Sequence, residues 1–299
     1  MGMEGHDDNL PLVAFTTLAP LAAGGIVGLL LVGRPAFSSE PDWGALLVLA
    51  VAVCALAVSF LHLGHPLRAY RAVARLSSSW LSREVLLFGL FVLCLAVYGV
   101  PWSGGEGVRQ LCLIAAAVLA LAAVFATGKV YQLGAHPSWN HWATVASFPA
   151  GALSAGLALG IFASDLGVPA ATQDSERLAA VTALATGFLA VALIVNWIRM
   201  RRLRNGNDEE RASWRLVQGP YRGVLILRAV AAAVAAVLLA GTGLAIALAW
   251  VAAALGELAD RILLFYTTVP VSPRNRAGDP RFGQRPTQGN DIDASGVRS

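Results

Sequence analysis

Long apolar runs separated by short polar segments dominate the sequence. Eight runs are long enough for a helix to cross the roughly 30 Å hydrocarbon core of a bilayer. They cover Leu12–Val32, Gly44–Leu63, Val85–Val100, Gln110–Tyr131, Trp142–Phe162, Leu178–Ile198, Val224–Ala240 and Leu244–Tyr266. Gly241-Thr242-Gly243 predicts a turn between the last two runs. The pattern therefore predicts an all-α polytopic membrane protein with eight transmembrane helices.

Composition favours the same class. The 299 residues are 57% hydrophobic and 13% charged, whereas soluble domains carry about 25% charged residues. We expect residues 1–269 to form one membrane domain. Residues 270–299 are rich in Pro, Gly, Arg and Asp and are expected to form a polar, largely irregular extension. The N-terminus lacks the basic segment of a signal peptide, so the first run is expected to remain as a membrane helix.

Basic residues gather on one side of this topology. That side holds both termini and the segments 64–83, 132–141 and 199–222, whereas the opposite side holds only Arg34, Arg109 and Arg177. Because cytoplasmic loops carry the excess of Lys and Arg, both termini are predicted to be cytoplasmic. Topology then accounts for the excess of 22 basic over 18 acidic residues without a nucleic-acid partner. Docking of an acidic partner on some of these arginines is the alternative.

Histidine and cysteine positions limit the cofactor chemistry. Four of the five histidines fall at or near one membrane face, namely His62, His65, His136 and His141. No pair is placed in the middle of the membrane, so we expect no haem in this chain. The three cysteines lie inside apolar runs without CxxC spacing, which argues against an iron–sulfur cluster, a zinc site or a disulfide framework. We therefore expect no bound metal.

The polar segment from His62 to Glu84 joins the second and third runs, so its two ends lie at the same membrane face. Quinol oxidation releases two electrons and two protons. It needs a hydrogen-bonding group that titrates near neutral pH and a second group that passes the proton to water, roles that suit His62 and Glu84. Alternatively, His62 only ends a helix and Glu84 pairs with Arg83, Arg68 or a helix N-terminus. The spacing alone leaves both hypotheses open.

Further polar residues lie near this face. Lys129, Tyr131, Trp139 and Asn140 either line a quinone pocket or anchor the membrane interface. Glu257 and Arg261 are one helical turn apart in the last run. We expect them to form a structural ion pair, with a functional intramembrane charge as the alternative.

Two clusters of arginines are candidates for binding partners. Arg68, Arg71 and Arg75 share one face if their segment is helical, and that face suits lipid phosphates or an acidic partner surface. Arg201, Arg202 and Arg204, together with the segment that begins at Asp208, are expected to form a solvated loop, with docking of a partner as the sharper alternative.

Four stretches agree with one known family. They are His62-Leu-Gly-x-Pro-x-Arg-Ala with Leu81-Ser82-x-Glu84, Pro11-Leu-Val-Ala-Phe-Thr-Thr, Lys129-Val-Tyr-Gln-Leu-x-x-x-Pro137-x-Trp139-Asn140, and Gly256-Glu-Leu-x-x-Arg261-x-x-x-Phe265-Tyr266. Through them the chain resembles the membrane anchor subunits of the dimethyl sulfoxide reductase type, the DmsC family, over most of its length up to Pro270.

The resemblance implies an eight-helix, haem-free subunit of a bacterial cytoplasmic (inner) membrane, similar in fold to the polysulfide-reductase anchors. It also implies an iron–sulfur partner subunit that binds a molybdopterin catalytic subunit, with electrons exchanged between the nearest cluster and ubiquinone or menaquinone. Residues matching His62 and Glu84 are linked to the quinone site in that family. Further pocket candidates within the motifs are Arg68, Ser82, Tyr131, Trp139 and Asn140, and docking candidates are Arg71, Arg75, Arg201, Arg202 and Arg204.

Sidedness distinguishes two branches of such enzymes. In the namesake enzymes the loop that corresponds to residues 64–83 is placed on the periplasmic side, whereas the arginines here place it in the cytoplasm. The cytoplasm-facing sulfite dehydrogenases of sulfur-oxidising bacteria fit better, with electrons running from sulfite into quinone. The alternatives are a menaquinol-oxidising anchor of an S- or N-oxide reductase, a membrane transporter and a purely structural anchor. Transporters often show internal repeats and interrupted helices, and neither is clear in this sequence.

Overall fold

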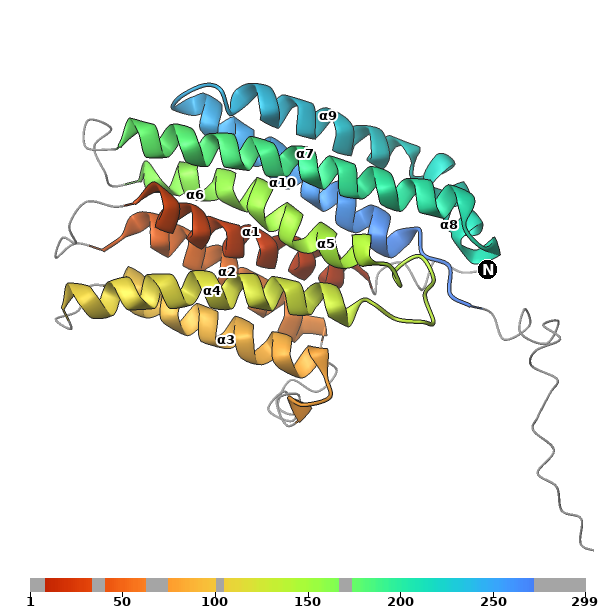
Figure 1. Ribbon diagram of the computed structural model, residues 1–299, viewed down its shortest axis with the longest axis horizontal. Coiled ribbons are helices and arrows are strands. Elements are labelled where there is room, and N and C mark those ends of the chain that lie inside the picture. Colours follow the sequence, from red (N-terminus) through yellow and green to blue (C-terminus); the bar gives the residue numbers. More distant parts are fainter. Residues whose placement is uncertain (1–8, 34–40, 63–74, 101–104, 167–173, 272–299) are drawn as a thin grey trace, which may run out of the picture.

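A computed structural model describes residues 9–33, 41–62, 75–100, 105–166 and 174–271. In this part of the chain the long elements are helices that run alongside one another in a bundle (Figure 1). They are α1 (Leu10–Val32), α2 (Trp43–His62), α3 (Trp80–Gly99), α4 (Glu106–Val130), α5 (Trp142–Gly151), the π-helical turn η4 (Ala152–Gly156), α6 (Leu157–Ser164), α7 (Ser175–Asn205), α8 (Asp208–Gln218), α9 (Arg222–Leu238) and α10 (Leu244–Tyr266).

Six spans within the described residues are long and apolar enough to cross a membrane. They are α1, α2, α3, α4, α7 and the continuous stretch Trp142–Ser164. The pair α8 and α9, bent by 72°, brings the number to seven at most. The predicted eight transmembrane helices are therefore not confirmed. The reasons are local: α9 has 17 residues, and the second half of α10 carries Glu257, Asp260 and Arg261.

The chain after α7 departs from the predicted solvated loop. α7 continues to Asn205, and Asp208–Gln218 forms the amphipathic helix α8. Asn207 begins this helix with a capping box, because its side chain accepts the Glu210 N–H and the Glu210 carboxylate accepts the Asn207 N–H, each at 2.9 Å. Glu210 also pairs with Arg202 at 2.7 Å and so joins α8 to α7. The loop prediction was wrong because a local capping signal starts a new helix at this point.

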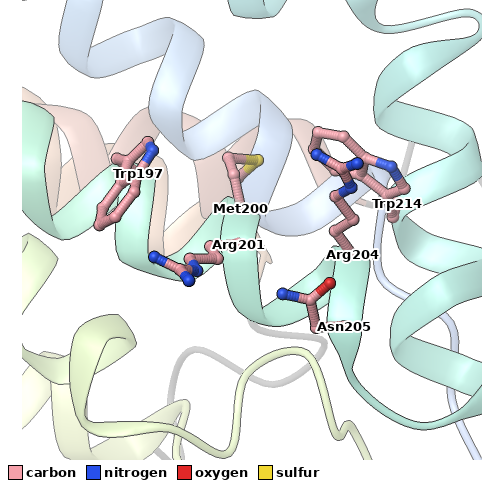
Figure 2. Close-up of a pocket in the computed structure, with 6 residues that line it drawn as sticks. All are labelled: Trp197, Met200, Arg201, Arg204, Asn205 and Trp214. Atoms are coloured by element: carbon pink, nitrogen blue, oxygen red, sulfur yellow. The ribbon is translucent and has the colours of Figure 1, made fainter.

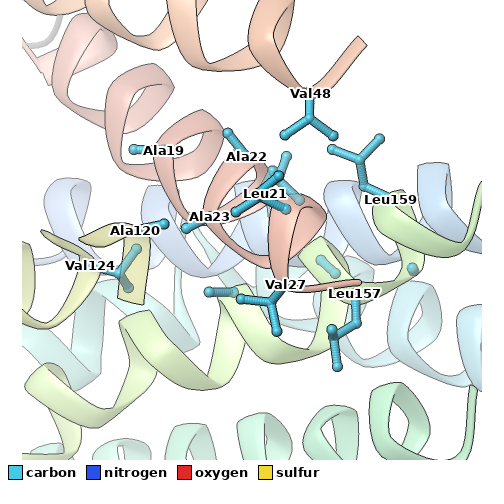
Figure 3. Close-up of a cluster of buried hydrophobic side chains, with 14 of the residues drawn as sticks. Ala19, Leu21, Ala22, Ala23, Val27, Val48, Ala120, Val124, Leu157 and Leu159 are labelled. Atoms are coloured by element: carbon cyan, nitrogen blue, oxygen red, sulfur yellow. The ribbon is translucent and has the colours of Figure 1, made fainter. Parts of the chain in front are cut away.

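Helix α1 lies at the centre of the bundle and contacts α2, α4, η4, α6 and α10. It is apolar around its whole circumference, as expected for a helix surrounded by protein. Figure 3 shows side chains of α1 meeting Val48 of α2, Val124 of α4, and Leu157 and Leu159 of α6. The helix is therefore fixed by packing on several sides at once.

Two glycine pairs set the closest helix approach in the bundle. Gly24 and Gly28 of α1 face Gly156 and Gly160 of the η4–α6 segment, each pair at a spacing of four residues. A Cβ atom at Gly24 would clash with the carbonyl oxygen of Ala152 and lie 2.6 Å from the Cα of Gly156. Small residues at this spacing let membrane helices pack backbone against backbone.

We expect Gly24→Ala to destabilise the fold by about 1–3 kcal/mol, because the added methyl group forces α1 away from η4. The matched control is Gly89→Ala in α3, where a Cβ would meet nothing within 4 Å. That change should leave stability unchanged or raise it slightly, since alanine is the better helix former. Thermal unfolding of the two variants in detergent measures the difference. Equal unfolding temperatures for both variants would contradict the close approach.

Candidate functional site

Glu84 lies near the start of α3, just after the first turn, and this helix begins at Trp80, five residues before the predicted run. Ser79 causes the early start, because its hydroxyl accepts the Ser82 N–H at 3.3 Å and caps the helix. The Glu84 carboxylate is buried, and its Oε1 accepts a hydrogen bond from the Thr127 hydroxyl of α4 at 2.7 Å. An acidic group buried beside a neutral donor is costly, and such groups often mark functional sites.

The neighbouring arginine does not neutralise Glu84. Arg83 donates to the carbonyl oxygens of Leu76 and Ser77, at 2.8 and 2.7 Å, and its guanidinium lies 4.3 Å from the ring centroid of Trp80. The ion pair between Glu84 and Arg83 that the sequence left open is therefore not formed. Arg68, the other cation considered, lies outside the described residues.

His62 is the last residue of α2. Its side chain lies outside the part of the structure that is described, as do His65, Arg68 and Arg71. Because α2 packs against α3, the end of α2 and the first turn of α3 lie at the same end of the bundle. A direct contact between His62 and Glu84 stays a prediction.

An aromatic cluster covers the same end of α4. Tyr131 follows α4 directly, and its ring centroid lies 5.7 Å from that of Trp139, 5.8 Å from Phe148 and 5.0 Å from Phe265. Trp139 donates its indole N–H to the carbonyl oxygen of Leu264 at 2.8 Å. Burial, and secondarily the charge of Glu84, raise the pKa of Tyr131 above its usual value, so the phenol keeps its proton.

The remaining pocket candidates are placed differently. Ser82 is buried in the first turn of α3, whereas Asn140 is exposed to solvent. His136 stacks on Trp139 with 4.3 Å between ring centroids, and burial lowers the pKa of its imidazole. His141 caps α5 by accepting the Ala143 N–H at 3.1 Å. The structure thus gathers Ser82, Tyr131 and Trp139 toward the interior and leaves Asn140 at the surface.

An open cavity of about 380 Å³ lies beside this end of α4 and α5. Its lining residues are Phe125, Lys129, Gln132, Trp142, Val145, Ala146 and Pro149. Phe125 contacts Trp80 of α3 edge to face, with ring centroids 6.0 Å apart, and the Lys129 ammonium lies 5.8 Å from the same ring. Glu84 does not line the cavity. The Glu84 site therefore lies between α3 and α4, whereas the cavity lies between α4 and α5.

A cluster of charged side chains lies buried in the bundle around α10. As predicted, Glu257 and Arg261 form an ion pair one turn apart. Sequence reasoning missed the rest of the cluster. Asp260 accepts hydrogen bonds from Asn196 at 2.7 Å and from Arg199 at 2.8 Å, both on α7. The three charged residues close together in one apolar helix were the available signal, but their partners on α7 could not be read from it.

Backbone oxygens complete the coordination of the buried arginines. Arg228 of α9 lies 3.4 Å from the Asp260 carboxylate and donates to the carbonyl oxygens of Gly256 and Ala192, at 3.0 and 3.2 Å. Arg261, which has no exposed surface, donates to the carbonyl oxygen of Thr16 at 3.1 Å. These contacts join α1, α7, α9 and α10, so the cluster serves as a structural tie within the bundle.

Phe148 of α5 links the charged cluster to the aromatic cluster. The Phe148 ring stacks on the ring of Tyr131. The guanidinium of Arg261 lies 3.9 Å from the centroid of the Phe148 ring. Tyr131 in turn lies within electrostatic reach of both Glu84 and Arg261. Through Phe148 and Tyr131, the charged cluster and the aromatic cluster are in contact with each other.

With this geometry established, comparison with known proteins identifies the class. Residues 3–266 match the family model of the DMSO reductase anchor subunit, DmsC. The match covers nearly the whole chain, and the chain belongs to this family. The resemblance drawn from the four sequence stretches is confirmed. Together with the apolar spans, it makes this chain a helical membrane protein.

Three relatives are similar over parts of the chain. The C subunit of sulfite dehydrogenase from Allochromatium vinosum is 44% identical over 57 residues, which are 19% of this chain and 18% of that protein. The C component of anaerobic dimethyl sulfoxide reductase from Haemophilus influenzae is 26% identical over 50% of this chain and 57% of its own length. The YnfH protein of Escherichia coli is also named for anaerobic dimethyl sulfoxide reductase. It is 27% identical over 50% of this chain and 54% of its own length. Each match covers less than two thirds of the relative.

Proposed function

We propose that this chain is the quinone-reactive membrane anchor of a three-subunit molybdopterin oxidoreductase. It exchanges electrons between the quinone pool and an iron–sulfur subunit, and the substrate reacts in a molybdopterin subunit. Membership of the anchor family supports the role of anchor. The observation that supports the quinone site is the buried Glu84 carboxylate, held by Thr127 at one end of the bundle.

The groups around Glu84 fit the needs of a quinone. A quinone accepts or releases two electrons and two protons at its two oxygens, so its site needs hydrogen-bonding groups that exchange protons. The Glu84 carboxylate provides a proton acceptor, the Thr127 hydroxyl fixes its orientation, and Tyr131 contributes an aromatic wall. His62, at the end of α2, is proposed as the partner that bonds a quinone oxygen.

Within this family we propose a sulfite dehydrogenase that reduces quinone. The relative with the highest identity among the three is named for sulfite dehydrogenase. The concentration of arginines on one side also favours a cytoplasmic location of the partner subunits. A DMSO or S-oxide reductase anchor that oxidises menaquinol is the second candidate, since two relatives are named for dimethyl sulfoxide reductase and match half of this chain.

Isolation of the intact complex tests the proposal. The chain, tagged and purified from native membranes in mild detergent, should copurify with an iron–sulfur subunit and a molybdopterin subunit. The preparation should reduce a ubiquinone analogue when sulfite is added. Reduction of dimethyl sulfoxide by a menaquinol analogue, without sulfite activity, would favour the second candidate. A chain that purifies with neither subunit would contradict the role of anchor.

A further inference from the structure

The C-terminal end of α7 forms a second cavity that the proposed electron transfer does not use. It has a volume of about 390 Å³, within the usual range of about 300–1,000 Å³ for small-molecule sites. Its lining residues are Trp197, Met200, Arg201, Arg204, Asn205 and Trp214 (Figure 2). Five of them project from the last turns of α7, and Trp214 reaches in from α8.

The outer face of α7 changes polarity along its length as it approaches this cavity. Ile194, Trp197, Arg201 and Arg204 follow one another at spacings of three, four and three residues, so they share one helical face. Ile194 and Trp197 are exposed by 56% and 59%, in a helix long and apolar enough to cross a membrane. Along this face an aliphatic side chain is followed by a tryptophan, a residue common at membrane interfaces, and then by two guanidinium groups. A phospholipid changes from apolar to charged in the same order, from its acyl chains to its phosphate.

The two arginines of the cavity are free to bind an external anion. Their neighbours Arg202 and Arg211 pair with Glu210 and Asp208. In the described part of the chain, Arg201 and Arg204 form no ion pair, and no acidic side chain lines the cavity. The Arg201 guanidinium lies 5.3 Å from the ring centroid of Trp197, a cation–π contact that holds it at the rim.

We propose that this cavity binds the headgroup of an anionic phospholipid. Arg201 and Arg204 contact the phosphate, because guanidinium groups donate paired hydrogen bonds to phosphate oxygens. The Asn205 amide and the Trp214 indole supply further polar contacts, while the acyl chains follow Trp197 and Ile194 along α7. A zwitterionic headgroup is disfavoured because its ammonium group would lie beside two guanidinium groups. Basic pockets at membrane helix ends bind anionic lipids for this reason.

Native mass spectrometry of the full-length chain in detergent tests the proposal. The probes are phosphatidylglycerol and phosphatidylcholine with identical acyl chains. The unaltered chain should retain phosphatidylglycerol in preference to phosphatidylcholine. The double variant Arg201→Gln/Arg204→Gln should lower phosphatidylglycerol occupancy about tenfold, with phosphatidylcholine unchanged. The single variant Arg204→Gln should lower it about threefold and provides the same test if the double variant does not fold.

The matched control is Arg211→Gln/Arg222→Gln, which removes the same charge from two exposed positions outside the cavity. It should bind phosphatidylglycerol as the unaltered chain does. An equal loss in the control would overturn the proposal, because net charge alone would then explain binding. Undiminished phosphatidylglycerol occupancy in the cavity variants would overturn it too. If the cavity variant kept its lipid but lost a copurifying subunit, the cavity would be a protein-docking surface instead.

Discussion

Replacing Arg261 with methionine is expected to lower the free energy of unfolding by about 3–5 kcal/mol. Its guanidinium pairs with Glu257, lies 3.5 Å from the Asp260 carboxylate and donates to the carbonyl oxygen of Thr16. Arg199 and Arg228 continue to neutralise Asp260 in the variant. The penalty therefore falls on Glu257, which is left buried without its paired cation. Chemical or thermal unfolding in detergent measures the change.

A double variant separates the cost of the unpaired charge from the cost of lost packing. Glu257→Gln/Arg261→Met removes both charges, so it should recover a large part of the stability that Arg261→Met alone loses. Arg215→Met on the exposed surface of α8 is the control and should change stability by no more than about 0.5 kcal/mol. A double variant as unstable as the single one would show that Glu257 is not the group left unpaired.

The second large effect concerns Glu84 and rests on the proposed function. We expect Glu84→Gln to lower quinone-coupled turnover of the assembled complex by about 100-fold, which is within the usual contribution of a proton-transfer group. Glutamine keeps the shape of the side chain and an oxygen that can accept the Thr127 hydrogen bond, but it cannot take up a proton. Oxidation of the substrate with an artificial dye, which bypasses the membrane subunit, should remain unchanged.

Two further variants sharpen this test. Glu106→Gln removes an exposed carboxylate at the opposite end of α4 and should leave both activities as they are. His62→Gln should reduce quinone coupling in the same way as Glu84→Gln if the two residues share one site. Normal quinone coupling in an assembled Glu84→Gln complex would overturn the site assignment. A loss of assembly in place of coupling would identify Glu84 as a structural residue.

Much of the helical arrangement could be predicted because lipid imposes a local requirement. A helix that crosses hydrocarbon must be predominantly apolar over about 20 residues, and the apolar run from Leu244 to Tyr266 predicted the bounds of α10. The number of membrane spans was harder to predict, because charged residues interrupt the apolar pattern of α10. Charged residues in α10 are tolerated because α7, α9 and α1 surround them, and that burial is not visible in the sequence of α10 alone.

The sequence contains a local signal for the start of helix α8. Asn207 and Glu210 stand three residues apart, the spacing of a capping box, directly before an amphipathic segment. The local sequence was therefore sufficient to predict this helix. In contrast, the cavity beside Trp214 depends on how α8 folds back against α7, which the capping box does not determine.

The sequence by itself determined the class of protein, the apolar spans and the position of Glu84 near the start of a helix. These properties depend on composition, on helix length and on capping by neighbouring residues, all of which are local. Only the tertiary structure decided which polar groups far apart in the chain contact one another. The donor to Glu84 is 43 residues away in the chain, and the carbonyl oxygen of Thr16 is 245 residues from Arg261. Such pairs form because a buried polar group without a partner is costly, and packing decides which partner is within reach.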